Sequence, residues 1–370
     1  MLTPWDDYPI HQIPAPIVQA AGSEPGRYER YWFSWFDRAQ SVYAGFGLGI
    51  YPNTGVIDAA FSVADAQGQE ALFACGRADP MRQTLQAGPI RLDVVEPMRT
   101  LRIRVDETDG LGLDLTWHAR TPVALEPRAQ RAQGGVQITD VTRTVQFGHC
   151  SGHMTAFGTR HDMDPAHWLG TRDRSWGMRS IAAAGADPAM RPKSAYFCWA
   201  ILQFDDFCAV VNLNEEADGR PLVRSATWLP VIGPDAPVLG DGLGVCHTGL
   251  IDLDIGYQPG SRHPAGAKLV LGPRGGIALD ARLEPRYRFQ MKGLGYFHPR
   301  RAHGGWHPDE PVRRESWRHD SLDPLAGENI HAQTIVTARC ADGRVGLGAL
   351  EHLVIGPYEP AGIPASGPAA

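Results

Sequence analysis

Short runs that alternate apolar and polar residues recur along the chain, whereas long runs with helical spacing are scarce. Residues 101–105 (Leu-Arg-Ile-Arg-Val) alternate as a half-buried strand does. Asp109-Gly110 follows and favours a hairpin turn, after which the alternation resumes at 111–117 (Leu-Gly-Leu-Asp-Leu-Thr-Trp). The pattern therefore predicts an all-β chain made of antiparallel hairpins.

The hairpin pattern returns about 165 residues later, where 267–271 and 277–283 alternate on either side of a Gly-Pro-Arg-Gly-Gly turn. A second pair of segments matches at almost the same offset, one opened by Tyr31-Trp-Phe-Ser-Trp-Phe and the other by Tyr196-Phe-Cys-Trp-Ala-Ile. The strands predicted after these two openings are 43–51, 55–64, 207–213 and 222–229. Two matches at one offset indicate an internal duplication, although two generic β-hairpins can also coincide.

Each copy is about the size of one antiparallel β-barrel or sandwich domain, so each can bury a core of its own. We predict one domain at 1–169, a second at 170–356, and a tail at 357–370 that is poorly ordered at its end. A single helical turn, capped by Asp164, is expected at 164–169.

The composition is that of an ordinary globular protein, with 43% of the 370 residues hydrophobic and 21% charged. The net charge of -6 comes with no basic stripe, which argues against nucleic acid as a partner. The start of the chain lacks a secretory signal, and no apolar run approaches the roughly 20 residues of a membrane-spanning helix. Six cysteines without a Cys-x-x-Cys pair fit buried thiols in a reducing compartment. We therefore expect a soluble cytoplasmic protein without a membrane span, and a homodimer stays open.

The densest group of reactive side chains lies between two glycines, in Gly170-Thr-Arg-Asp-Arg-Ser-Trp-Gly177. If this segment is extended, Arg172 and Trp176 share one face and Asp173 points to the other. Paired with an arginine, Asp173 would stay ionised as part of a structural clasp between the domains. In a drier pocket its pKa would instead rise, and it could act as a general acid. The residues alone favour neither alternative.

The stretch 172–177 (Arg-Asp-x-Ser-Trp-Gly), flanked by two all-β halves, resembles the carotenoid 1,2-hydratase (hydroxyneurosporene synthase) and AttH-like group, to which plant tocopherol cyclases are distantly similar. The glycine-flanked segment 346–356 resembles the closing strand of such proteins. Arg174 stands where relatives often have histidine, which leaves the role of that position open. The resemblance implies an all-β, calycin-like fold of two tandem lipocalin-like antiparallel β-barrel or sandwich domains.

The resemblance also implies chemistry without a redox cofactor on a hydrophobic isoprenoid or aromatic small molecule. Such a lyase, hydratase, isomerase or cyclase protonates a double bond and then adds water or closes a ring. An acid kept protonated in an apolar cavity and aromatic faces that stabilise a carbocation would meet its needs. A lipocalin-like carrier that binds a hydrophobic ligand without catalysis is the alternative.

Asp173 is the expected acid, with His161 or His331 assisting as the other catalytic residue. Glu351 lies among apolar residues, and we expect an arginine partner for it, either Arg172 or Arg179. The residues expected to bind substrate are Trp176, Arg172, Tyr43, Tyr196, Trp199, Trp317 and Glu351.

No sequence signature of a cofactor is present, and we expect none. The segment Gly45-Phe-Gly-Leu-Gly49 lacks the third glycine of a dinucleotide loop and is expected to let strands approach closely or bend. His161, Asp162, Asp164 and His167 form a polar group whose spacing fits no standard zinc site, so no metal is expected.

Overall fold

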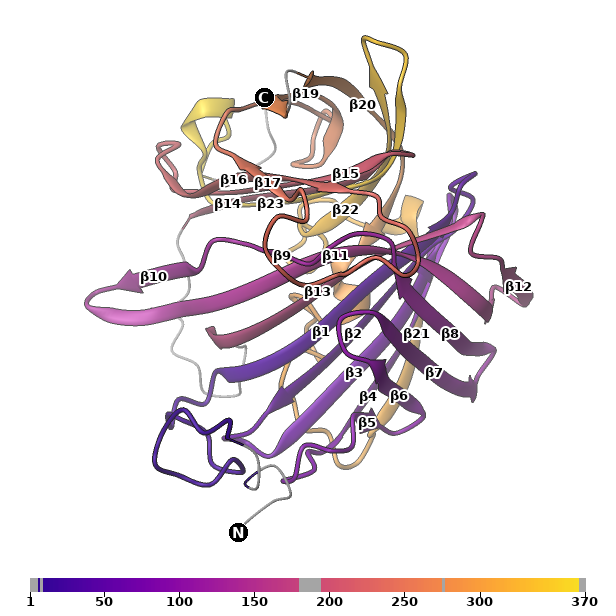
Figure 1. Cartoon of the computed structure of the whole chain (residues 1–370), viewed down its shortest axis with the longest axis vertical. Helices are drawn as coiled ribbons and strands as arrows, with labels where there is room; N and C mark the ends of the chain where they lie inside the picture. Colours follow the sequence, from indigo (N-terminus) through magenta and orange to yellow (C-terminus); the bar gives the residue numbers. More distant parts are fainter. Residues whose placement is uncertain (1–5, 7–8, 180–193, 275–276, 366–370) are drawn as a thin grey trace.

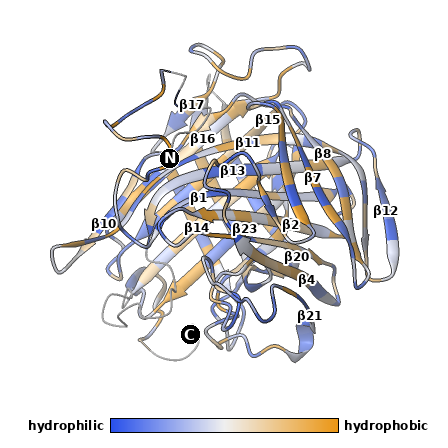
Figure 2. Ribbon diagram, turned by 90° about the horizontal axis from the view of Figure 1, so that it is seen from below, coloured by the Kyte–Doolittle hydropathy of each residue, from blue (hydrophilic) through white to orange (hydrophobic). Residues whose placement is uncertain are grey.

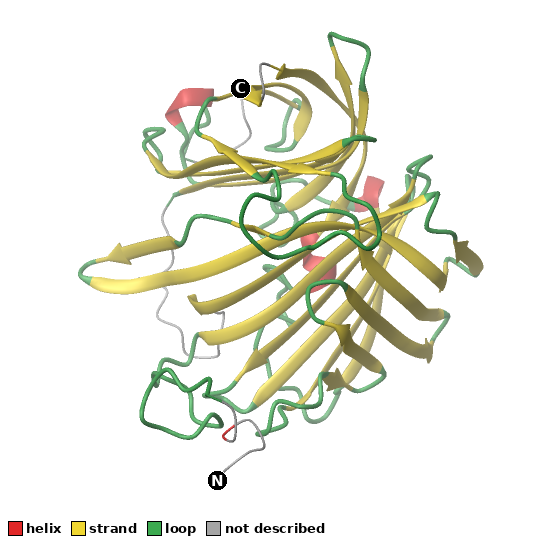
Figure 3. Cartoon of the chain, in the orientation of Figure 1, coloured by secondary structure: helices red, strands yellow, loops and turns green. Residues whose placement is uncertain are grey.

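Strands dominate the computed structural model, which describes residue 6 and residues 9–179, 194–274 and 277–365 (Figure 3). The last five residues of the predicted tail, 366–370, lie outside this description. Short 3-10 turns occur at Met291–Leu294 (η3), His319–Ser321 (η4) and Glu359–Ala361 (η5). Within these described ranges, no helix is long and apolar enough to cross a membrane. The all-β prediction is confirmed.

The described strands form two antiparallel sheets, one of fourteen strands and one of nine (Figure 1). The first sheet contains β1 (Arg27–Asp37), β2 (Tyr43–Tyr51), β3 (Val56–Ala64), β4 (Gly68–Arg77), β5 (Gln86–Ala87), β6 (Ile90–Glu96), β7 (Thr100–Thr108), β8 (Leu111–Ala119), β9 (Ala124–Leu125), β10 (Ala129–Gln133), β11 (Val136–Ala156), β12 (Thr159–Met163), β13 (Trp168–Arg179) and β21 (Val312–Arg318). The second contains β14 (Ala195–Gln203), β15 (Phe207–Glu215), β16 (Pro221–Pro230), β17 (Cys246–Thr248), β18 (Ile251–Tyr257), β19 (Pro264–Arg274), β20 (Ile277–Gln290), β22 (Ala332–Cys340) and β23 (Val345–Ile355).

The two sheets repeat one strand order. Neighbours run β4-β3-β2-β1-β13-β11-β8-β7-β6 in the first sheet and β17-β16-β15-β14-β23-β22-β20-β19-β18 in the second. Each predicted strand falls on its expected hairpin, so the alternation located the elements correctly. This one-to-one order is what a duplicated lipocalin-like unit produces, and the predicted fold class is confirmed.

The β7–β8 hairpin shows why local sequence suffices for such elements. Asp109 and Gly110 adopt φ of 50° and 82°, the two positive values that a tight hairpin turn needs. The strands on either side alternate buried and exposed positions, and Figure 2 shows the same alternation as hydropathy. Apolar side chains of this hairpin fill the interior of the first half-barrel.

Three apolar cores divide the molecule into layers. One fills each curled sheet, and the third lies between the sheets. Strand β2 is buried along its whole length because it separates the first core from the third. Gly45 of this strand faces the third core, where a Cβ would lie 2.9 Å from the ring of Phe289. A Cβ on Gly47 would lie 2.3 Å from the guanidinium of Arg30 on the neighbouring strand β1. Gly45 thus lets Phe289 of the second half pack closely on β2, and the expected role of the whole run Gly45–Gly49 in strand approach or bending stays a prediction.

One local expectation was wrong. Residues 165–167 form a turn rather than a helical turn through 169, because Trp168 already begins β13. The backbone N–H of Ala166 still donates to Asp164 Oδ1 at 2.8 Å. The segment 170–177 is extended, since β13 pairs with β1 on one side and β11 on the other.

The predicted division at 169/170 therefore falls inside a central strand of the first sheet. The chain also returns from the second half to the first, because β21 pairs with β4 at the sheet edge (Figure 1). As a division into folding units, the boundary stays a prediction.

Candidate active site

A cavity of about 350 Å³ lies between the two sheets, within the usual size range of ligand sites of about 300–1,000 Å³. Strands β1 and β13 line one side, β14 and β23 line another, and the β10–β11 hairpin and the segment after η3 complete the wall. Its aromatic residues are Tyr28, Trp32, Phe197, Trp199, Tyr296 and Phe297. Its titratable residues are Arg131, Arg143, Asp173, Arg179, His331 and Glu351.

Asp173 reaches this cavity from the middle of β13. The strand alternates, so Asp173 and Ser175 line the cavity while Arg172 and Trp176 do not. Asp173 is 9% exposed, and its Oδ1 has no hydrogen-bond partner in the described part of the chain. Burial raises the pKa of Asp173 to about 6, against the opposing effect of cations led by Arg143. A carboxyl of this kind holds its proton in weakly acidic conditions.

His331 and Glu351 form a buried pair in the same cavity. His331 Nε2 lies 2.7 Å from Glu351 Oε1, and Gln333 Nε2 donates to Glu351 Oε2 at 2.6 Å. The Tyr43 hydroxyl donates to Gln333 Oε1 at 2.7 Å. A carboxylate acceptor favours the tautomer with the proton on Nε2, which leaves a lone pair on His331 Nδ1, an atom without a partner among the described residues. Glu351 is thus held by histidine and glutamine, and the expected arginine partner was wrong.

The two acids occupy equivalent positions in the two copies. Asp173 pairs in register with Trp32 of β1, and Glu351 pairs with Trp199 of β14. The two indole rings meet edge to face with centroids 5.4 Å apart. The sequence carries the matching signal, Gly-x-x-Asp at 170–173 and Gly-x-x-Glu at 348–351. Aligning the two repeats therefore identifies Glu351 as the counterpart of Asp173.

Sequence reasoning missed a third carboxylate, Glu126, behind the cavity wall. Its oxygens accept from Trp199 Nε1 and Asn212 Nδ2, each at 2.9 Å, and lie 3.1 Å from Arg143 Nε. Arg143 in turn lies over the Trp199 ring at 5.5 Å. Glu126 thereby fixes the indole and the cation that face Asp173. No local pattern marks it, because two of its partners come from the other half of the chain.

Several predicted substrate-binding residues lie elsewhere. Arg172 faces the first half-barrel, where its Nε donates to Gln146 Oε1 at 3.1 Å. Trp176 is 38% exposed on that same opposite face of β13. Tyr43 lies behind the cavity and reaches it only through Gln333.

Three further predicted residues are remote from the cavity. Tyr196 packs in the second half-barrel, stacked on Tyr358 with ring centroids 4.1 Å apart. Trp317 lies on β21, where Lys292 Nζ is 4.7 Å from its ring. His161 lies in β12, and no group of three or more potential metal-ligating side chains occurs within 9–179, 194–274 and 277–365.

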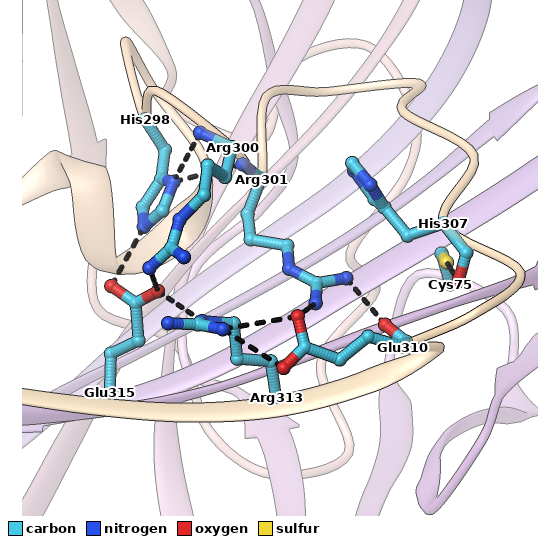
Figure 4. A network of polar contacts seen from close by, with 8 residues as sticks. All are labelled: Cys75, His298, Arg300, Arg301, His307, Glu310, Arg313 and Glu315. Atoms are coloured by element: carbon cyan, nitrogen blue, oxygen red, sulfur yellow. Dashed lines mark hydrogen bonds and ion pairs between the residues drawn. The ribbon is translucent and has the colours of Figure 1, made fainter.

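The segment after η3 brings aromatic rings to the His331 side of the cavity. Tyr296 and Phe297 meet the imidazole with centroids 5.2 and 5.8 Å away. The chain beyond them is held by ion pairs and a histidine hydrogen bond between the loop and β21, centred on Glu310 and Glu315 (Figure 4). Figure 4 also shows His298, whose Nδ1 accepts from the backbone N–H of Arg301 at 2.8 Å. This network holds the loop and so keeps the two rings in place.

Comparison with known proteins places residues 2–364 in a family of unknown function (DUF8625). The chain belongs to that family. No curated protein matches it.

Solved structures are similar in fold. An AttH-like protein from Nitrosomonas europaea is 12% identical with a TM-score of 0.56, over 88% of this chain and 92% of that one. Kievitone hydratase from Nectria haematococca is 14% identical with a TM-score of 0.51, over 88% of each chain. At such identities the likeness shows the tandem lipocalin-like fold, in agreement with the AttH-like resemblance. The closer resemblance to carotenoid 1,2-hydratases stays a prediction.

Proposed function

We propose that this protein is a lyase or isomerase of the hydratase type, which acts by acid-base chemistry on a hydrophobic isoprenoid or aromatic small molecule. The observation that carries the proposal is Asp173, a buried carboxyl whose pKa is about 6 and whose Oδ1 has no hydrogen-bond partner among the described residues, in an aromatic cavity opposite the His331–Glu351 pair. The name of kievitone hydratase, a protein of similar fold, supports the same class of reaction.

The geometry supports a two-step addition of water. Protonated Asp173 gives its proton to a carbon–carbon double bond, and the faces of Trp32 and Trp199 stabilise the carbocation that forms. A water molecule then adds to the cation, and His331 Nδ1 takes the released proton while Glu351 holds the ring. Solvent returns the proton from His331 to Asp173. Elimination of water follows the same steps in reverse, and loss of a proton from the cation completes an isomerisation.

The test compares Asp173→Asn with the unchanged protein on prenylated phenols and polyenes, with mass spectrometry to detect gain or loss of water. We expect the substitution to lower turnover by about 10²- to 10⁴-fold, the usual contribution of a general acid. Asp162→Asn is the matched control, because Asp162 is exposed in β12 and pairs with Arg160. Full turnover by Asp173→Asn would show that Asp173 is not the general acid.

A carrier of a hydrophobic ligand is the second candidate, favoured by the aromatic walls of the cavity. It predicts that Asp173→Asn leaves ligand affinity nearly unchanged and that no substrate is ever converted. Measuring affinity and turnover on the same variant therefore separates the two functions.

A further inference from the structure

Arg179 lines the cavity, and the described residues supply no ion-pair partner for it. Arg131 pairs with Glu216 at 3.0 Å and Arg143 with Glu126 at 3.1 Å. Arg179 also lines the cavity, at the end of β13, yet no described carboxylate lies within ion-pair distance of it. Asp173 lies in the same cavity and attracts Arg179 from a distance, but the described residues give Arg179 no direct ion pair.

The groups around Arg179 hold its guanidinium without neutralising it. The guanidinium lies 4.3 Å from the centre of the Tyr28 ring and 5.9 Å from that of Tyr296. One of its nitrogens lies 3.3 Å from Nδ1 of His303, whose Nε2 is 2.8 Å from the carbonyl oxygen of Leu294. Burial holds the pKa of His303 well below its usual range, so this histidine is a neutral acceptor.

A guanidinium fixed in this way is prepared to receive an anion. Aromatic faces orient it and leave in-plane N–H groups for a charge-assisted hydrogen bond. An unpaired charge in a partly dry site is costly, and an anionic ligand offsets that cost. A neutral ligand of the same shape gains only the contact with the rings.

We propose that Arg179 binds an anionic oxygen of the substrate, a carboxylate or an ionised phenol or enol, attached to the hydrophobic part that fills the aromatic cavity. This proposal adds the charge of the substrate to the proposed function, and it rests on that function only because both use the same cavity. It places the charged end of the ligand at Arg179 and the hydrophobic end towards Trp32 and Trp199.

The test uses two probes of one shape, 2-naphthoate and 2-naphthamide, titrated into the full-length protein by calorimetry at neutral pH. We expect the carboxylate to bind about tenfold or more tightly than the amide, as a charge-assisted contact provides. Arg179→Gln should remove this preference, and Arg179→Lys should keep part of it. Arg131→Gln is the matched control, since Arg131 lies in the same cavity but is already paired.

Equal affinity for the two probes, no measurable binding of 2-naphthoate, or a preference that survives in Arg179→Gln would overturn the proposal. Circular dichroism and thermal midpoints check that each variant is folded. Because the probes are not converted, the outcome does not depend on catalysis. Asp173→Asn should retain the carboxylate preference, so a protein that keeps this preference but shows no turnover would contradict only the proposed function.

Discussion

Asp173 and Trp176 show how a difference of three residues along a strand separates two roles. Both belong to the dense polar stretch of the sequence, but β13 turns them to opposite faces, so only Asp173 reaches the cavity. The alternation made this separation predictable. Which face meets a cavity depends on the packing of the second sheet against the first, and no local pattern contains that information.

Asp173 also makes the stability of the protein depend on pH. Its folded-state pKa of about 6 lies above the ordinary value of 3.8, so folding disfavours the ionised form. The cost is absent below about pH 4 and grows until the pH exceeds the folded-state pKa. At about 1.4 kcal/mol for each unit of pKa, it approaches about 3 kcal/mol. Asp173→Asn should therefore be more stable than the unchanged protein at pH 7, by up to that amount.

Urea denaturation at pH 4, 5, 6 and 7 measures this difference. The advantage of Asp173→Asn should shrink as the pH falls and vanish near pH 4. Asp162→Asn, which changes an exposed carboxylate of the same sheet, should show no such trend. A variant that is less stable at pH 7 would instead mean that Asp173 is a structural clasp, the alternative that the sequence left open.

At the scale of elements, hairpins were predictable, and the pairing of strands far apart in the sequence was not. The β7–β8 hairpin follows from alternation and from Asp109-Gly110, which are local features. The pairing of β13 with β1 joins residues more than a hundred positions apart, and that register brings Asp173 opposite Trp32. His331 and Glu351 are adjacent for a local reason, because the consecutive strands β22 and β23 pair near the ends that line the cavity.

The register of β14 against β23 depends on Gly348. A Cβ there would lie 1.9 Å from the backbone oxygen of Ile201, which has no freedom to move away. Gly348→Ala should therefore destabilise the protein by about 1–3 kcal/mol, the usual cost of forcing extra atoms into a packed core. Gly327→Ala is the control, because a Cβ at that position meets nothing within 4 Å.

Thermal and urea midpoints of the two glycine variants provide the measurement. The added methyl group should push β23 away from β14. Because Glu351 lies three residues further along β23, Gly348→Ala should also bind 2-naphthoate more weakly. Equal stability of the two variants would show that the strands can separate locally, and that the site does not rely on their close approach.

At the scale of the whole molecule, the duplicated all-β architecture was predictable because alternation and a repeated offset are visible in one sequence. The site between the copies was predictable only in part, through Asp173, His331, Trp199 and Glu351. Glu126 was not predicted, and Arg179 was expected only as a partner of Glu351, because the surroundings of both residues come from contacts between the halves. The pairing of β21 with β4 was not predicted for the same reason, since Arg314 and Glu70, which form an ion pair between these strands, are 244 residues apart in the sequence.

These contacts predict that the two halves unfold together. The core between the sheets draws side chains from both, and β21 completes the first sheet with a strand from the second half. Arg120 adds a buried clasp, in which its nitrogens donate to Gln203 Oε1 at 3.3 Å and to the carbonyl oxygen of Phe204 at 3.0 Å. Neither half can open without exposing apolar surface and unpaired polar groups of the other.

Differential scanning calorimetry should therefore show one transition whose calorimetric and van't Hoff enthalpies agree. Arg120→Met should lower the midpoint of that single transition by a few degrees, because it leaves buried acceptors of the second half unpaired. Arg38→Met is the control, since Arg38 also bridges to Asp205 but is exposed. Two separated transitions in the unchanged protein would mean that each half-barrel is stable alone, and that the cavity between them opens without unfolding either one.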